Sequence, residues 1–468
     1  MMTRTESHLM ASYISTAEAV AEESEVVRQT PRTVEEEPLL HHLPEGVHAT
    51  YGSLPSPIEV LTILYSAALS AMSSTCSEPS WFFPLAVVQG WREVSIPGVF
   101  DFAMKAVLFA SMSKVLLDEA FCSPSRVSTD TLLEQYFLPS RLSAYDKYSV
   151  RLPNGSEGTS LGVHYLESRS VHEAPQFDAL YLQHGFGASS LSWLPAMQPL
   201  TKSLRAKVGL AHDAVGFGFT DRPKDLEWYT HEASAAIGNE ILMQKVNANA
   251  EQEGSPKSVA LMGHSMGALS ALQMALTLPK ETSKFVVLAS PALGVRQCCA
   301  GKKASSSSVK KQASVLEEMA YPLAGFALRR LVGSENFWKT GLQSLWGNPK
   351  KVTESDVLRF QWPSIGAGWE RGLIDFARAQ GLPSSETDES LLQKVVDLPN
   401  TKVFVVLGSE DRITPSKQMR RFLDAFPQVE VVEMEGVGHD SFEENTEAFV
   451  GHVEEFLAKW QSLQTKDS

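Results

Sequence analysis

Three residues that could together perform nucleophilic chemistry each follow a strand-like run of apolar residues. The first is Ser265, in the G-H-S-M-G run 263–267, which lies between the apolar segment 258–262 and a helical pattern over 268–278. A serine on a sharp turn from strand to helix presents its hydroxyl clear of the sheet, next to the backbone N–H groups that begin the helix. Glycines two residues before and after the serine let the neighbouring segments approach closely. The pattern therefore predicts a nucleophilic serine.

An acid and a base follow two later strand patterns. The β-branched run 401–407 leads into a loop that holds Asp411, and the shorter run 429–434 leads into a loop that holds His439. The carboxyl ends of parallel strands are where catalytic groups gather in open α/β sheets. We therefore expect Asp411 and His439 to lie at the same edge of a sheet as Ser265.

The chain order of serine, aspartate and histidine, each just past a strand, resembles that of the α/β-hydrolase superfamily over about residues 146–460. The resemblance implies that Ser265 is the nucleophile, that His439 is the general base and then the acid, and that Asp411 orients and stabilises the imidazolium. Glu410 is an adjacent rival carboxylate. The G-x-x-D-x-x-x-P spacing nevertheless matches the family loop at Asp411.

A glycine-rich turn, H-G-F-G at 184–187, follows the strand pattern 177–183. By the same resemblance, the backbone N–H of Phe186 pairs with that of Met266 to form an oxyanion hole. Each such donor lowers the barrier to acyl transfer by roughly 2.7–4 kcal/mol. His184 is expected to brace this turn through hydrogen bonds rather than to act as a base.

A fourth motif, D-A-V-G-F-G-F-T-D-R-P at 213–223, follows the strand pattern 206–211. It resembles the superfamily's D-x-x-G-x-G-x-S-x-x-P loop, with Thr220 in the place of the serine. We expect Asp213 and the glycines to fix a tight turn that borders the pocket, without a role in proton transfer.

Composition narrows the class of protein. With 468 residues, of which 43% are hydrophobic, the chain can bury one large core and accessory segments. Its net charge of −14 argues against a nucleic-acid partner, which would require a basic surface. The four cysteines have neither metal-ligand spacing nor the pattern of a disulfide framework. We expect an intracellular protein, cytoplasmic or membrane-associated, with an organelle left open.

The chain divides into four predicted regions. Residues 1–50 read as a disordered acidic tail and 51–144 as a helical apolar extension. Residues 145–291 and 400–462 are expected to form the α/β-hydrolase core, a doubly wound and mostly parallel sheet. The excursion 292–399, after the sixth core strand, is too long for a plain connection and is expected to form a helical cap.

The cap region is predicted to contain helices at 314–331, 335–346 and 369–380. Its aromatic side chains either roof an apolar pocket or simply hold the cap together. They are Phe337, Trp338, Trp346, Trp362 and Trp369.

The apolar extension has two interpretations. Segment 55–121 is rich in large apolar side chains, but no uninterrupted run reaches the roughly 20 residues that a membrane span requires. The segment either packs on the hydrolase core, which we favour, or makes a peripheral membrane contact.

Taken together, these motifs predict a serine hydrolase that cleaves a carboxylic ester of an apolar or lipid-like substrate through an acyl-enzyme, without cofactor or metal. Three alternatives remain. A C–C bond hydrolase would use the same triad, and a lipid acyltransferase would replace water by an alcohol, although the H-x-x-x-x-D pattern of many such enzymes is absent. The third is a non-catalytic ligand-binding receptor.

Overall fold

The computed structural model describes residues 143–464, apart from 153–156, 173, 248–254, 295–324, 326–327, 330–331, 333–334, 367 and 381–385. Several predictions fall outside the described residues. These are the acidic tail, nearly all of the apolar extension with its membrane or packing role, and most of the helix predicted at 314–331.

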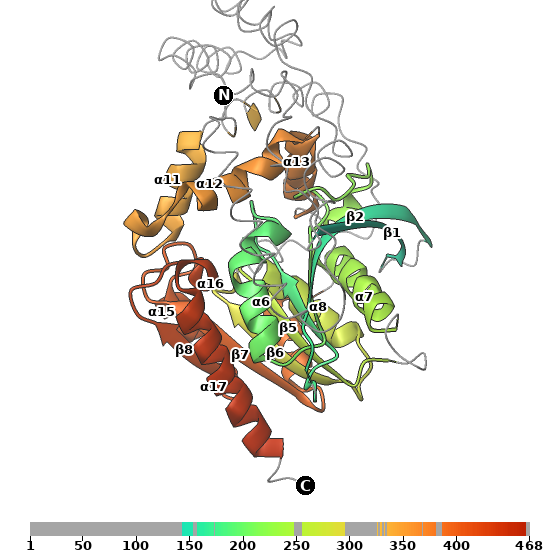
Figure 1. Ribbon diagram of the computed structural model, residues 1–468, viewed down its shortest axis with the longest axis vertical. Helices are drawn as coiled ribbons and strands as arrows, with labels where there is room; N and C mark the ends of the chain where they lie inside the picture. The colour runs from blue at the N-terminus through green and yellow to red at the C-terminus, as the bar shows by residue number, and fades with distance from the viewer. Residues whose placement is uncertain are drawn as a thin grey trace, which may run out of the picture. The chain divides into compact units, whose positions relative to one another are not determined.

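Eight strands of the described chain form one sheet in the order β1-β2-β4-β3-β5-β6-β7-β8 (Figure 1). The strands are β1 Ser143–Arg151, β2 Glu157–Arg169, β3 Ala179–Gln183, β4 Val208–His212, β5 Ser258–His264, β6 Ser283–Ala289, β7 Thr401–Gly408 and β8 Glu430–Met434. Strand β2 pairs antiparallel with β1 and with β4, whereas every pairing from β4 to β8 is parallel. The predicted mostly parallel sheet is confirmed.

From β3 onward, helices of the described chain lie between successive strands. The α-helices are α6 Leu194–Ser203, α7 His231–Asn247, α8 Gly267–Thr277, α11 Glu335–Leu345, α12 Glu354–Gln361, α13 Trp369–Ala379, α14 Asp388–Val396, α15 Ser416–Leu423, α16 Ser441–Glu444 and α17 Thr446–Gln464. The 3-10 helices are η4 Ser190–Trp193, η5 Leu226–Tyr229, η6 Pro349–Lys351 and η7 Trp362–Ile365.

Both faces of the sheet are buried under helices. On β6, the ring of Phe285 lies 5.7 Å from that of Trp460 on α17, whereas the next residue, Val286, shares a core cluster with residues of α7 and α8. Successive side chains of a strand point to opposite faces. Helix α17 therefore covers one face and α7 with α8 the other, which is the doubly wound arrangement that the sequence predicts.

A helical segment is inserted between β6 and β7. Helices α11 and α13 match the helices predicted at 335–346 and 369–380 to within one residue. Helix α12 begins at a capping box, in which Thr353 and Asp356 each bind the other's backbone N–H. Helix α14 packs against α8 and β7, so the end of the insertion rejoins the helical layer of the core.

Two kinds of feature are absent from the part of the chain that the structure describes. None of its helices combines the length and the apolar character needed to cross a bilayer. Nor does it hold a group of three or more His, Cys, Asp or Glu side chains arranged to bind a metal ion.

Candidate active site

Ser265 occupies a strained turn between β5 and α8. Its φ is +51°, a left-handed conformation that non-glycine residues rarely adopt. Its N–H donates to the carbonyl of Ala289 at 3.0 Å, and its own carbonyl accepts from the N–H of Ala292 at 3.0 Å. Such a conformation costs about 1–3 kcal/mol and persists only where the surroundings enforce it. These two hydrogen bonds, one to the end of β6 and one to the loop after it, hold the serine in that conformation.

The glycines on either side of the serine are required by close packing. A Cβ atom at Gly263 would lie 2.5 Å from the carbonyl oxygen of Gly267. A Cβ atom at Gly267 would lie 2.5 Å from the carbonyl oxygens of Gln183 and His184. Any side chain at either position would therefore push the strand, the serine turn and the H-G-F-G turn apart.

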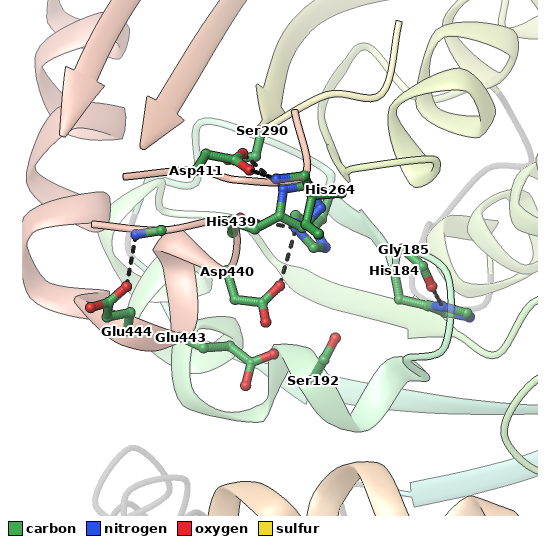
Figure 2. A network of polar contacts seen from close by, with 12 residues as sticks. His184, Gly185, Ser192, His264, Ser290, Asp411, His439, Asp440, Glu443 and Glu444 are labelled. Carbon is green, nitrogen blue, oxygen red and sulfur yellow. Dashed lines mark hydrogen bonds and ion pairs between the residues drawn. The ribbon is translucent and has the colours of Figure 1, made fainter. Parts of the chain in front are cut away.

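The acid and the base predicted from the sequence are in contact. His439 Nδ1 lies 2.8 Å from Asp411 Oδ2, and both side chains are buried (Figure 2). The other oxygen, Oδ1, accepts the backbone N–H groups of Ile413 and Thr414 at 2.8 and 2.9 Å. Burial alone would raise the pKa of Asp411, but the hydrogen bond and charge of His439, with the donors from Thr414, outweigh it and lower the pKa. The neighbouring Glu410 is exposed.

The serine turn and the histidine loop adjoin one another. His264, the residue before Ser265, has its Nε2 atom 3.1 Å from the carbonyl oxygen of His439. The two imidazole rings are 4.8 Å apart between centroids. Ser265 itself is 7% exposed, so the turn is nearly closed to solvent. The structure thus places all three predicted residues at the carboxyl edge of the sheet, with Asp411 and His439 in direct contact.

The two expected oxyanion donors flank the serine turn. A Cβ atom at Gly185 would lie 3.0 Å from Ser265 Cβ, so the H-G-F-G turn that carries Phe186 lies directly against the serine. Met266 is the N-cap residue of α8, whose first N–H groups have no acceptor within the helix. Phe186 is 55% exposed.

His184 has both ring nitrogens occupied. The N–H of Ala214 donates to Nε2 at 3.0 Å, and Nδ1 donates to the carbonyl of Gly185 at 2.8 Å. Burial lowers the pKa of His184, which favours the neutral ring that this pattern requires. The interpretation of His184 as a hydrogen-bonding brace is confirmed.

Asp213 fixes the loop after β4. Its Oδ1 atom accepts the N–H of Ser190 at 2.7 Å, and its Oδ2 atom accepts the N–H of Phe219 at 2.8 Å. The ring of His164 contacts Oδ2 at 2.7 Å. Burial alone would raise the pKa of Asp213, but His164 and the N–H donors hold it well below its usual value. The carboxylate is thus fully engaged in structure, as the sequence predicts.

A small cavity of about 20 Å³ lies beside the serine turn, which is room for about one water molecule. Met266 lines it on the side of the expected oxyanion donors, and Phe217 and Phe376 contribute aromatic walls. His231 and Ser270, 3.3 Å apart between Nδ1 and Oγ, form a polar part of the wall. Phe376 belongs to α13, so the cavity is bounded by both the core and the inserted segment.

The sequence leaves two interpretations for five aromatic side chains, which either roof a pocket or hold the cap together. None of the five is among the residues that line this cavity. The four tryptophans are buried, and Trp338 contacts both Phe337 and Trp369 within the inserted helices. Phe376 of α13 lines the cavity instead. The helical pattern over 369–380 predicts its helix but not the direction of this ring.

Glu444 joins the histidine loop to the inserted segment. Its carboxylate accepts the backbone N–H groups of Gly347 and Asn348, after α11, at 2.8 and 2.7 Å. It also accepts the N–H of Gly438, directly before His439, at 2.8 Å. The sequence gives no signal for this role, because Glu444 lies in a short acidic stretch that resembles a solvated surface.

We expect Glu444→Ala to lower the free energy of unfolding by roughly 2–4 kcal/mol, because three backbone N–H groups lose their acceptor in a buried or half-buried place. Urea denaturation measures the change. Glu447→Ala is the matched control, since Glu447 is exposed at the start of α17, and should change stability by less than about 0.5 kcal/mol. Equal midpoints for the two variants would contradict the role assigned to Glu444.

Three known proteins resemble this chain over more than half of its length. A relative from Pseudomonas putida, 2-hydroxymuconate semialdehyde hydrolase, is 25% identical over 309 residues, which are 63% of this chain and 92% of the relative. The chloroplastic protein PHYLLO of Arabidopsis thaliana is 26% identical over 251 residues, or 53% of this chain and 13% of that protein. A solved esterase from Rhodococcus sp. ECU1013 is 19% identical with a TM-score of 0.45, covering 67% of this chain and 98% of its own.

The family model described as the alpha/beta hydrolase family matches residues 180–452. This range runs from β3 into α17 and takes in the serine turn, the aspartate loop and the histidine loop. It covers more than half of the 468 residues. The chain therefore belongs to the alpha/beta hydrolase family.

Proposed function

We propose that this protein is a serine hydrolase that cleaves a carboxylic ester of an apolar, lipid-like substrate through an acyl-enzyme. The observation that carries the proposal is the left-handed Ser265 turn, which adjoins the buried pair of His439 and Asp411. A strained serine at the carboxyl end of a strand, beside an imidazole whose far nitrogen is held by a carboxylate, is the arrangement that activates a hydroxyl.

In the first half of the reaction, Ser265 Oγ attacks the ester carbonyl and His439 Nε2 takes the hydroxyl proton. The N–H groups of Phe186 and Met266 stabilise the negative charge that develops on the carbonyl oxygen. Collapse of the tetrahedral intermediate breaks the bond to the alcohol, which leaves with the proton from His439. Asp411 keeps the imidazole in one orientation and stabilises its positive charge.

In the second half, water attacks the acyl-enzyme and gives its proton to His439. The second tetrahedral intermediate collapses, the carboxylic acid leaves, and Ser265 recovers its proton. We propose that the inserted helices act as the cap in both steps. The position of Phe376 on the cavity wall and the hydrogen bonds from Glu444 to the segment after α11 support this role.

The cavity supports an apolar acyl group. Its aromatic walls, Phe217 and Phe376, have ring centroids 4.8 Å apart and line the same cavity as Met266, where the acyl chain of a bound ester would begin. The cavity itself has room for about one water molecule. We propose that movement of one or both rings accommodates the acyl chain, so that this wall selects for chain length.

A C–C bond hydrolase is the second candidate. The observation in its favour is the similarity to 2-hydroxymuconate semialdehyde hydrolase, which is 25% identical. A serine triad would serve either reaction, because both pass through nucleophilic attack on a carbonyl.

The test compares kcat/KM for 4-nitrophenyl esters of graded acyl length with that for a vinylogous diketone. We expect the esters to be turned over faster, with Ser265→Ala as the background control for both substrates. Faster cleavage of the diketone would assign the C–C reaction instead. Formation of a new ester when a long-chain alcohol is added would assign acyl transfer.

A further inference from the structure

Two buried side chains next to the reacting residues have no part in the mechanism above. His264 precedes Ser265, Asp440 follows His439, and the two are 4% and 2% exposed. His264 Nε2 lies 3.3 Å from Asp440 Oδ1, and Figure 2 shows the carboxylate turned towards the imidazole. Because each residue is the chain neighbour of a reacting residue, their contact joins the serine turn directly to the histidine loop.

The direction of the hydrogen bonds from His264 is fixed by its partners. Its Nε2 atom lies 3.1 Å from the carbonyl oxygen of His439, which can only accept. Nε2 must therefore carry a proton, and Asp440 Oδ1 lies 3.3 Å from the same nitrogen. Burial lowers the pKa of His264 well below its usual value, so the ring is neutral and its Nδ1 is bare. Nδ1 has no hydrogen-bond partner among the described residues.

Asp440 occupies a position where an aspartate side chain ordinarily caps the helix that follows it. It is the N-cap residue of α16, and an aspartate there usually accepts an N–H from the first turn. Asp440 makes no such bond. Its Oδ1 faces His264, and its Oδ2 is buried without a hydrogen-bond partner in the described part of the chain. Because the Asp440 carboxyl group does not cap its helix, we look for its role outside that helix.

We infer that His264 and Asp440 are a positioning pair for His439. His264 holds the His439 carbonyl, and Asp440 holds the His264 ring. The N–H of His439 donates to the carbonyl of Leu345 at 2.7 Å, and its Nδ1 contacts Asp411. Both backbone groups and one ring nitrogen are then fixed, so the ring presents its Nε2 to the serine. This inference rests on the proposed serine mechanism.

The packing around the pair supports a rigid role. The ring of Phe442 lies 5.0 Å from that of His264 and stacks on Trp193 at 3.9 Å. The imidazole therefore packs against a ring that is itself stacked on Trp193. A substitution that removes the Nε2 donor but keeps the volume of the side chain would therefore free the His439 carbonyl without leaving a cavity beside Phe442.

The experiment compares His264→Leu with His264→Gln. Leucine fills the space but removes the donor, whereas the glutamine NH₂ reaches about as far as Nε2. We expect His264→Leu to lower kcat on a 4-nitrophenyl ester by about 10- to 100-fold with little change in KM, since misplacing a reacting group has that effect. The rate of labelling by a fluorophosphonate probe should fall in parallel. His264→Gln should retain most of the wild-type kcat.

Asp440→Ala should lower kcat in the same way, and the double variant with His264→Leu should be no worse than His264→Leu alone, because the two residues act through one contact. If His264→Leu does not fold, the inference is tested by comparing the kcat of Asp440→Ala, which should fall, with that of His264→Gln, which should not. The control is Ser441→Ala, a buried neighbour whose hydroxyl has no described partner and whose loss should leave kcat unchanged.

Two results would overturn the inference. The first is that His264→Leu and Asp440→Ala both have the wild-type kcat while Ser265→Ala is inactive. The pair would then have a structural role but no role in positioning His439. The other is a His264→Gln variant as slow as His264→Leu at unchanged melting temperature. Activity that survives in Ser265→Ala would instead refute the serine mechanism itself, so the two failures are distinguishable.

Discussion

Ser265→Ala is expected to lower kcat for ester cleavage by about 10⁴–10⁶, with the fold intact. The variant removes the atom that forms the acyl-enzyme, and the remaining groups can only assist direct attack by water. Alanine has no greater difficulty than serine with the φ of +51° at this position, so stability should change little. Circular dichroism and the thermal midpoint check the fold, and loss of labelling by a fluorophosphonate probe checks the nucleophile.

Ser290→Ala is the matched control for this variant. Ser290 follows β6 in a similar left-handed conformation, with a φ of +42°, and its buried hydroxyl has no described hydrogen-bond partner. It therefore shares the backbone strain and the burial of Ser265 without its place beside the oxyanion turn. We expect kcat within the range of the wild type. Near wild-type turnover in Ser265→Ala, or its loss in Ser290→Ala alone, would contradict the assignment of the nucleophile.

Local patterns were sufficient to predict the sheet and the neighbourhood of the site. Strands β5 and β7 are short, buried and mostly apolar, and β8 is a shorter, half-buried strand. The loops that follow these three strands carry Ser265, Asp411 and His439. Because parallel strands end at one edge of a sheet, the meeting of these loops follows from strand order alone. The proximity of the loops that carry Asp411 and His439 is thus predictable, whereas the contact between the two side chains was expected from the resemblance to the α/β-hydrolase superfamily.

Contacts that depend on how distant segments dock were not predictable. Glu444 and Gly347 are 97 residues apart, and their hydrogen bond exists only because the inserted segment settles on the histidine loop. Phe376 lines the cavity because of the rotation of α13 against the core, which periodicity leaves undetermined over so short a helix. The contact between His264 and Asp440 was likewise not predictable. Their chain neighbours, Ser265 and His439, are the residues that the motifs identify.

Asp411→Asn is expected to lower kcat by about 10⁴ through the tautomer of His439. In the native protein Asp411 Oδ1 accepts two backbone N–H groups, from Ile413 and Thr414, while Oδ2 faces His439 Nδ1. Asparagine must keep its oxygen towards the two N–H groups, so its NH₂ takes the place of Oδ2. That group donates to Nδ1, which forces the proton onto Nε2 and leaves no acceptor for the hydroxyl proton of the serine.

Glu410→Gln provides the comparison, because it makes the same change of carboxylate to amide one residue away. Glu410 is exposed and its backbone N–H, rather than its side chain, holds the loop through the carbonyl of Val437. We expect kcat/KM to change little, and both variants should melt near the wild-type temperature. A large loss in Glu410→Gln with activity retained in Asp411→Asn would make Glu410 the acid. That outcome would require the loop to rearrange in solution, since only Asp411 now reaches the histidine among these two carboxylates.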